Sequence, residues 1–293
     1  MYQIIQKRKI LLIISGIACT ISLLALIFWG LRPGIDFTGG AMMEIRYEKN
    51  VPSIAEVEGK LQSLNLGQID LRPVGEKGFI LRLKNIDEET HQNILSSLNN
   101  PEELEFDSIG PSIGREVTQK AQLAVILMVI FILIYIAWAF RKLSRIIQKG
   151  ESWRYGIGAI LAMLHDVLII LGLFAILGHF RGTEINATFI VAILTVLGYS
   201  VNDTIVIYDR IRENFLIYGS KDFENTVNRS LNEILGRSLT TGFGALLSLL
   251  AIFLFGGEST KDFALTMIVG IVTGSWSSIA IATPFLLWKR KKS

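Results

Sequence analysis

The sequence predicts a helical polytopic membrane protein, with six transmembrane helices and a small external α+β domain between the first two. Of the 293 residues, 51% are hydrophobic and only 19% are charged, and the mean hydropathy is +0.46. The charged residues are gathered in blocks that separate long uncharged runs. A soluble globular domain usually has about a quarter of its residues charged. The composition therefore argues against an ordinary soluble enzyme.

Six runs are long enough to cross a bilayer, which takes about 20 predominantly apolar residues. Four of them, the first, second, fifth and sixth, carry no charged residue over 22, 20, 20 and 26 positions. The third is broken only by His165 and Asp166, and the fourth only by Asp203. All are longer than a signal-peptide core of about 7–15 residues. The sequence therefore predicts spanning helices over 10–31, 121–140, 155–180, 185–208, 238–257 and 263–288.

Lysine and arginine lie mostly on one side of these spans. Seventeen flank the spans on the side of the N-terminus, whereas the opposite short loops hold only Arg181 and Lys261. Because basic residues are enriched in cytoplasmic loops, both termini are expected in the cytoplasm. A connector over 209–236, with an amphipathic surface helix over 222–235, and a basic C-terminal tail are expected on the same side. The net charge of +3 follows from this topology and does not require nucleic-acid binding.

The segment 32–119 is too long for a simple loop and is expected to fold as an extracytoplasmic domain. It separates the first span, in 1–31, from the other five, in 120–293. Apolar residues alternate at strand spacing around 43–47, 69–71, 79–83 and 104–106, and recur at helical spacing around 54–64 and 94–98. The order strand, helix, strand, strand, helix, strand is typical of a ferredoxin-like domain. His91 is expected to be a solvated helix residue.

Ionisable residues within the spans are the candidates for function. A charged side chain in hydrocarbon costs at least about 2.5–3.5 kcal/mol, so such residues are usually paired or functional. Asp203 and Arg237 both lie near the cytoplasmic ends of their spans, and their side chains are expected to reach each other. Burial disfavours an ionised carboxylate, whereas a nearby arginine favours it. A pair that separates would be a proton switch, and a pair that does not would be a static packing contact; the residues alone leave both interpretations open.

Other polar residues could support such a site. His165 and Asp166 lie nearer the middle of the third span, and Tyr199 lies on the Asp203 face of the fourth helix. Asn202 adds an amide next to Asp203, so these side chains could line a polar track. The sequence contains no Walker, HExxH or CxxC motif. These absences argue against a hydrolytic or ATP-driven enzyme, and the sequence implies no metal and no organic cofactor.

Four motifs resemble those of the SecD/SecF family of protein-export membrane proteins. GIDFTGG, at 34–40, is similar to the glycine-rich signature of the family. GYSVNDTIVIYDRIREN, at 198–214, is similar to the fourth-helix motif of its SecF branch. HDV, at 165–167, and GPSIGRE, at 110–116, resemble the third-helix motif and the link into the second helix. The resemblance covers nearly the whole chain.

The resemblance implies an accessory, non-enzymatic subunit of the bacterial Sec translocase, in the RND superfamily and in the plasma membrane. Such a subunit pairs with SecD, associates with SecYEG and, in many bacteria, with YajC, and uses the proton-motive force to help pull unfolded secretory polypeptides outward. By the same resemblance, Asp203 and Arg237 match the proton-linked residues of the family. The glycine-rich motif, with Gly34, Asp36, Gly39 and Gly40, would form a hinge or tight junction. Protons are the implied coupling ion, and sodium remains open.

Two other functions are compatible with parts of the sequence. One is a proton-coupled RND-type exporter of small molecules or lipids, although such exporters carry larger docking domains. The other is an intramembrane aspartyl protease that uses Asp166 and Asp203. In that case Arg237 would hold one carboxylate ionised, whereas an aspartyl dyad shares a proton.

Overall fold

The computed structural model describes residues 2–140, 153–219 and 222–288. The predicted cytoplasmic loop between the second and third spans and the predicted basic C-terminal tail lie mostly outside the described residues. Contacts divide the protein into two compact units, Pro33–Leu123 and the remainder.

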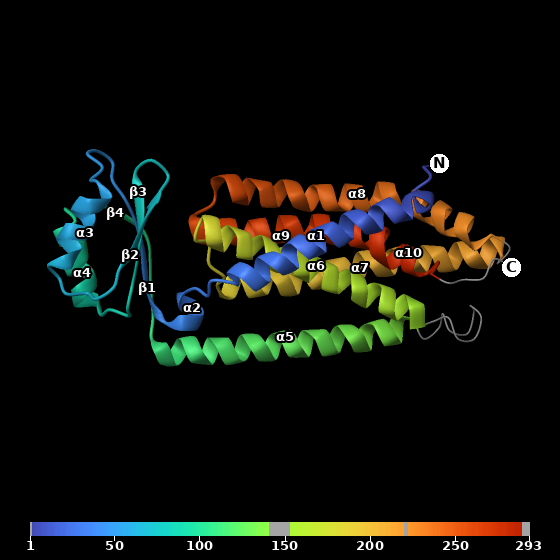
Figure 1. The fold of residues 1–293 in the computed structure, drawn as a ribbon, viewed down its shortest axis with the longest axis horizontal. Coiled ribbons are helices and arrows are strands. Elements are labelled where there is room, and N and C mark those ends of the chain that lie inside the picture. Colours follow the sequence, from blue (N-terminus) through green and yellow to red (C-terminus); the bar gives the residue numbers. More distant parts are fainter. Residues whose placement is uncertain (1, 141–152, 220–221, 289–293) are drawn as a thin grey trace. The chain divides into compact units, whose positions relative to one another are not determined.

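Six helices are long and apolar enough to cross a membrane. They are α1 (Arg8–Trp29), α5 (Pro111–Phe140), α6 (Trp153–Phe180), α7 (Ala187–Tyr218), α8 (Phe223–Phe255) and α9 (Glu258–Ser277), drawn in Figure 1. A short 3-10 turn, Ile5–Lys7, precedes α1. The last span continues from α9 through a π-helical turn, Ser278–Ala282, into α10 (Thr283–Phe285). The prediction of a polytopic helical protein with six spans is confirmed, and the chain is a multi-pass membrane protein.

The helical unit is organised around α6, α7 and α9, which pack against one another. α1 lies against α6, and α8 lies against α7 and α9. Glycines allow close approach, because a Cβ atom on Gly270 of α9 would lie 2.1 Å from Val196 of α7. Likewise, a Cβ atom on Gly172 of α6 would lie 2.3 Å from Ser22 of α1. Small residues have this role in many membrane helix pairs.

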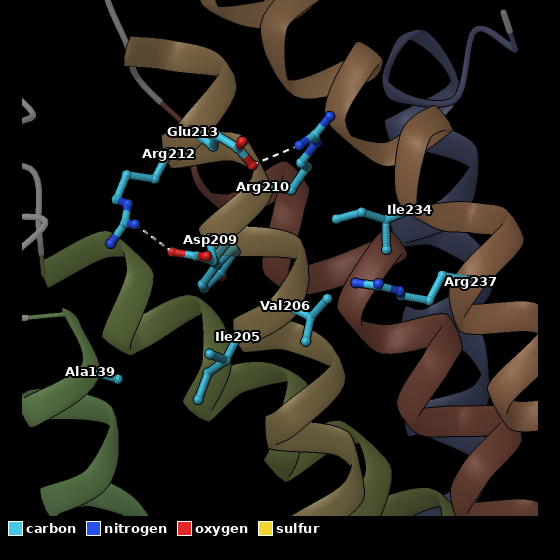
Figure 2. A pocket seen from close by; sticks show the side chains of 10 residues that line it. Ala139, Ile205, Val206, Asp209, Arg210, Arg212, Glu213, Ile234 and Arg237 are labelled. Atoms are coloured by element: carbon cyan, nitrogen blue, oxygen red, sulfur yellow. Dashed lines mark hydrogen bonds and ion pairs between the residues drawn. The ribbon is translucent and has the colours of Figure 1, made fainter. Parts of the chain in front are cut away.

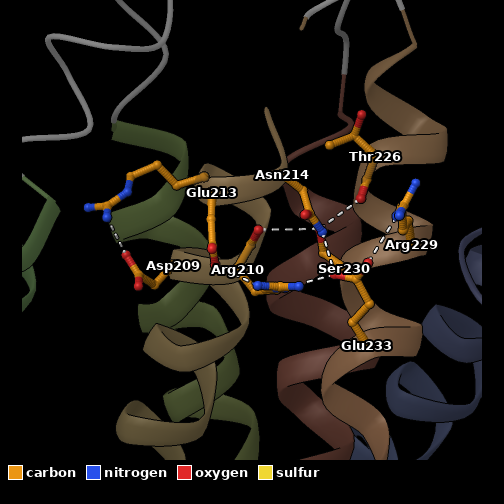
Figure 3. Close-up of polar contacts among 9 residues, drawn as sticks. Asp209, Arg210, Glu213, Asn214, Thr226, Arg229, Ser230 and Glu233 are labelled. Carbon is orange, nitrogen blue, oxygen red and sulfur yellow. Dashed lines mark hydrogen bonds and ion pairs between the residues drawn. The ribbon is translucent and has the colours of Figure 1, made fainter. Parts of the chain in front are cut away.

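The connection between α7 and α8 is more helical than predicted. α7 runs on to Tyr218 and α8 begins at Phe223, so the predicted surface helix over 222–235 is the first part of α8. A polar cluster joins the two helices beyond the apolar spans (Figure 3). In this cluster the Glu233 carboxylate accepts hydrogen bonds from Arg210, Arg229 and Asn214 at 2.7–2.9 Å.

The N-terminus packs against the same part of α8. The backbone N–H groups of Tyr2 and Ile4 donate to the side chains of Asn232 and Asn228. Arg8 forms an ion pair with Glu224 at 2.7 Å. The start of the chain and the α7–α8 connection therefore lie at one end of the helical unit.

The smaller unit contains four strands and two helices in the predicted order. These are β1 (Gly40–Arg46), α3 (Ile54–Gln62), β2 (Asp70–Val74), β3 (Gly78–Leu83), α4 (Glu88–Ser97) and β4 (Glu102–Ile109). The sheet order is β2-β3-β1-β4, and every neighbouring pair is antiparallel. This order is the ferredoxin-like arrangement that the sequence predicts.

The core of this unit forms between the sheet and its helices, which cover one face (Figure 1). β1 and β3 supply alternate residues, and α3 and α4 supply residues one turn apart: Met43, Ile45, Tyr47, Phe79, Leu81, Leu83, Val57, Leu61, Ile94 and Leu98. Both helices begin at side-chain caps. Ser53 and Glu56 form the predicted capping box. Asp87 accepts from the side chain and from the backbone N–H of Thr90, and these hydrogen bonds lower the pKa of the Asp87 carboxyl.

The expectation that His91 is solvated is wrong. The side chain is buried, and its ring stacks on Phe106 with centroids 3.8 Å apart. His91 Nε2 lies 2.7 Å from a carboxylate oxygen of Glu103, on the neighbouring β4. Phe106 and Glu103 both come from β4, so packing against this strand, and not the local helical pattern, determines the burial of His91.

The glycine-rich motif forms a tight junction within the smaller unit. Its first residues make the short helix α2 (Ile35–Thr38), in which Thr38 Oγ1 donates to the carbonyl of Gly34. Gly39 has a φ of +74°, which favours glycine, and a Cβ atom there would lie 2.9 Å from Cα of Pro111. A Cβ atom on Gly114 would lie 2.9 Å from the backbone nitrogen of Gly39. The segment that follows the first span thus packs directly on the start of α5.

We expect Gly39→Ala to destabilise this junction for two reasons, the left-handed backbone and the contact with Pro111. Gly67→Ala is the matched control, because Gly67 has a similar φ of +77° and no atom within 4 Å of its Cβ position. The left-handed conformation alone costs about 1–2 kcal/mol. Hydrogen exchange of the backbone amides at 35–39 and 112–118 measures the difference. Equal exchange at these amides in both variants would show that the close approach contributes nothing.

Candidate functional site

Asp203 lies in the middle part of α7, where it is half-buried. Its Oδ1 atom accepts a hydrogen bond from the hydroxyl of Ser238, on α8, at 2.8 Å. Its Oδ2 atom is buried and has no hydrogen-bond partner among the described residues. A buried carboxylate oxygen without a donor is unfavourable when the group is ionised. The arrangement thus favours either a proton on Asp203 or the arrival of a further donor.

The predicted contact between Asp203 and Arg237 is absent from the described part of the structure. Arg237 directly precedes Ser238 on α8, but no ion pair or hydrogen bond joins it to Asp203. Its side chain is exposed to a pocket beside α7, next to Val206 and Ile234 (Figure 2). Arg237 does not reach Asp203 because the side chains of successive residues on a helix point in directions about 100° apart. Ser238 faces Asp203, so its neighbour Arg237 faces elsewhere.

His165 and Asp166 form a buried polar cluster at the centre of the helical unit. His165 Nδ1 and Asp166 Oδ1 are 2.9 Å apart. Since an ionised carboxylate can only accept, Nδ1 is the donor. Asp166 Oδ2 accepts from the hydroxyls of Ser200, on α7, at 2.6 Å and Ser277, on α9, at 2.8 Å. Asp166 is fully buried, and its two hydrogen bonds with serines join α6 to α7 and to α9.

The two carboxylates differ in how completely they are satisfied. Asp166 has donors on both oxygens, as a stable buried carboxylate requires. Asp203 has a donor on one oxygen only, among the described residues. The donors come from four different helices, and one of them, His165, leaves its own Nε2 buried without a hydrogen-bond partner there. Among the described residues, the carboxylate of Asp166 is therefore more completely hydrogen-bonded than that of Asp203.

Of the two other residues that the sequence places near Asp203, Tyr199 lies inside the helical unit and Asn202 lies on its surface. Tyr199 hydrogen-bonds with Ser275 of α9, and the hydroxyl group lies 3.4 Å from a Cβ atom placed on Gly242 of α8. It therefore lies between α7, α8 and α9, as Asp203 does between α7 and α8. Asn202 is exposed on the outer surface of the helical unit and contributes to neither cluster.

Sequence reasoning missed the serines that serve both carboxylates, because serine is common in membrane helices for packing alone. Ser277 also directly precedes the π-helical turn Ser278–Ala282. Within that turn Ser278 pairs with Thr204 of α7 at 2.8 Å, and the carbonyl of Ala282 accepts from the hydroxyl of Tyr208. π-helical turns occur frequently at functional sites. The run of serines at 275, 277 and 278 was the available signal.

Metal binding has no support from the described residues, where no three His, Cys, Asp or Glu side chains are grouped as ligands. The chemistry of the site is instead that of hydrogen-bonded carboxylates, which hold or release protons.

Two family models match the chain. One, described as "Protein export membrane protein SecD/SecF, C-terminal", matches residues 90–292. The other, described as the "SecD/SecF GG Motif", matches residues 25–51 and so includes the junction glycines.

Similar proteins align over nearly the entire chain. "Protein translocase subunit SecF" of Thermobaculum terrenum is 40% identical, and the alignment covers 99% of this chain and 95% of the relative. The SecF of Anaerolinea thermophila is 37% identical, with 99% and 94% covered. "Protein translocase subunit SecDF" of Brucella abortus is 34% identical, and the alignment covers 94% of this chain but only 35% of that longer protein.

A solved structure has the same fold. The crystal structure of SecDF, described as a translocon-associated membrane protein from Thermus thermophilus, superposes with a TM-score of 0.81 at 30% identity. The superposition covers 98% of this chain, which spans 38% of the length of that SecDF chain. The motifs, the six spans with a ferredoxin-like domain after the first, and these matches lead to one conclusion: the chain belongs to the SecD/SecF family of protein-export membrane proteins.

Proposed function

We propose that this protein is the SecF subunit of a bacterial Sec translocase and couples the proton-motive force to the late stage of protein export. The single observation that carries the coupling role is the half-satisfied carboxylate of Asp203 within a membrane span. Relatives that are named translocase subunits over nearly their full length support the export role.

In this proposal Asp203 alternates between a protonated and an ionised form. In the ionised form its buried Oδ2 needs a donor, and Arg237 is the nearest cation along α8, one residue before Ser238. Movement of α8 relative to α7 would bring the guanidinium group to the carboxylate, and protonation would release it. Each gain or loss of a proton by Asp203 therefore changes the contacts between α8 and α7. Such a discrete change in helix packing is a general means of converting a local event into a larger movement.

Asp166 has a different role in this proposal, as a fixed anchor. Its hydrogen bonds with Ser200 and Ser277 hold α6, α7 and α9 together. Ser200, one of its partners, lies three residues before Asp203 on α7. α8 contributes no partner to Asp166 among the described residues, so it is the helix that is free to move. The anchor thus keeps Asp203 in place while its surroundings change.

The remaining parts of the proposal concern partners and orientation. Six spans are half of a twelve-helix RND unit, and the fused SecDF relative supports a pairing with SecD. SecYEG, YajC and an unfolded secretory polypeptide are further proposed partners. The excess of basic residues on one side supports cytoplasmic termini and an external ferredoxin-like domain. No cofactor is proposed beyond the coupling ion, which is a proton, with sodium as the alternative.

Neither alternative function has an observation in its favour. An exporter of small molecules or lipids would carry a larger external domain than Pro33–Leu123. An intramembrane aspartyl protease would bring its two carboxylates together. Here Asp166 is bound by His165 and two serines, and the described residues supply only Ser238 to Asp203.

We expect Asp203→Asn to leave the protein inserted and bound to SecD but to abolish its stimulation of secretion, because an amide cannot exchange a proton. The measurement is translocation of a secretory precursor into vesicles that contain the variant complex, with and without a proton gradient. Glu224→Gln is the control, because this acid pairs with Arg8 at the end of the helical unit. Stimulation at the wild-type level by Asp203→Asn would remove Asp203 from the mechanism.

We expect Arg237→Met to reduce the gradient-dependent part of translocation by at least about tenfold, the effect of a change of roughly 1.4 kcal/mol. Arg237→Lys should retain part of it, because it keeps the charge that Asp203 needs but loses the bidentate geometry of arginine. The same vesicle assay measures both variants, with Arg8→Met as a control. If the lysine and methionine variants were equally active, the charge at position 237 would have no part in coupling.

A further inference from the structure

A pocket of about 340 Å³ lies beside Arg237, between the ends of α5, α7 and α8 (Figure 2). One wall is apolar and includes Ala139 of α5, Val206 of α7 and Ile234 of α8. The other wall is charged and comes from the segment of α7 between Asp209 and Glu213. The apolar run of α7 ends at Asp209, so the pocket lies where the membrane span meets the water.

The charges in this pocket do not cancel. Three arginines and two acids line it, which leaves one positive charge in surplus. Arg210 binds Glu213 and Glu233, and Arg212 binds Asp209 at 3.0 Å. Arg237 has no ion-pair partner in the part of the chain that the structure describes, and it is the source of the surplus. Arg212 is turned toward Asp209, and its Nε atom is buried, so Arg237 is the cation that remains open to a ligand.

An uncompensated arginine at a membrane boundary needs an anion. Arginine binds phosphate with two parallel hydrogen bonds, and basic pockets between membrane helices bind anionic lipid headgroups. A soluble anion would use only the charged wall, whereas a phospholipid also places glycerol and acyl carbons against the apolar wall. We propose that this pocket binds the phosphate headgroup of an anionic phospholipid, with Arg237 as the donor.

A bound lipid would compete with Asp203 for Arg237. Occupancy of the pocket would hold the guanidinium group away from the carboxylate, as it is in this structure, and release of the lipid would free it. This regulatory consequence rests on the proposed function, whereas the binding site itself does not.

The test uses the chain purified as a complex with SecD, stripped of lipid and titrated with phosphatidylglycerol or with phosphatidylcholine of the same acyl chains. Native mass spectrometry counts the bound lipids. We expect phosphatidylglycerol to bind about tenfold more tightly than phosphatidylcholine. Arg237→Gln should weaken the binding of phosphatidylglycerol by about tenfold, the usual effect of losing a charge-assisted hydrogen bond. Arg8→Gln is the matched control, because Arg8 is a paired arginine at the same end of the helical unit and outside the pocket.

Three results would overturn the proposal. The first is equal binding of phosphatidylglycerol and phosphatidylcholine. The second is a loss of phosphatidylglycerol binding in Arg8→Gln as large as that in Arg237→Gln. The third is displacement of phosphatidylglycerol by an equal concentration of glycerol phosphate, which would show that the ligand is a soluble anion. Arg237→Lys keeps the test decisive if Arg237→Gln fails to assemble with SecD, because this variant keeps the charge and should still bind phosphatidylglycerol more tightly than phosphatidylcholine; equal binding of the two lipids by Arg237→Lys would also overturn the proposal. The readout is binding without translocation, so a failure here is distinguishable from a failure of the export function.

Discussion

The cost of an ionised carboxylate inside a membrane determines how this helical unit is built. A buried charge is tolerated only when hydrogen-bond donors replace the water that it has lost. Asp166 has this replacement in full, from His165, Ser200 and Ser277. Asp203, one turn further along α7 than Ser200, has a single donor among the described residues, Ser238. The first carboxylate therefore stabilises one arrangement of α6, α7 and α9, and the second leaves the position of α8 open to change.

Packing around the anchor follows from the same requirement. Ser200 of α7 and Ser277 of α9 donate to the same oxygen of Asp166, so these two helices must lie close together. Gly270 and Gly274 allow this, since Cβ atoms there would approach Val196 and Ser200 to 2.1 and 3.0 Å. The π-helical turn then follows at Ser278–Ala282, and side chains of α7 satisfy its polar groups. The glycines thus allow the helices to approach closely, and the polar side chains then hold them together through hydrogen bonds.

The sequence was sufficient to predict the six spans, because an almost uncharged run of about twenty apolar residues matches the thickness of a bilayer. It also predicted the ferredoxin-like order and the helix cap at Ser53, which depend on local periodicity and spacing. It failed for His91 and for the Asp203–Arg237 contact. Both depend on which way a side chain points once strands or helices have packed, and local patterns do not contain that information. Ser200 and Ser238 were missed because an isolated serine in a membrane helix has no distinguishing neighbours in the sequence. Ser277 stands in a run of serines, but such a run fits helix packing equally well.

The central claim is that Asp203, and not Asp166, changes its protonation state. Infrared difference spectroscopy of the purified complex with SecD during a pH titration tests this most directly, because protonated and ionised carboxyl groups absorb at different frequencies. The account predicts a protonated-carboxyl band that Asp203→Asn removes and that Asp166→Asn leaves in place. A band that persists in Asp203→Asn, or that disappears only in Asp166→Asn, would contradict it.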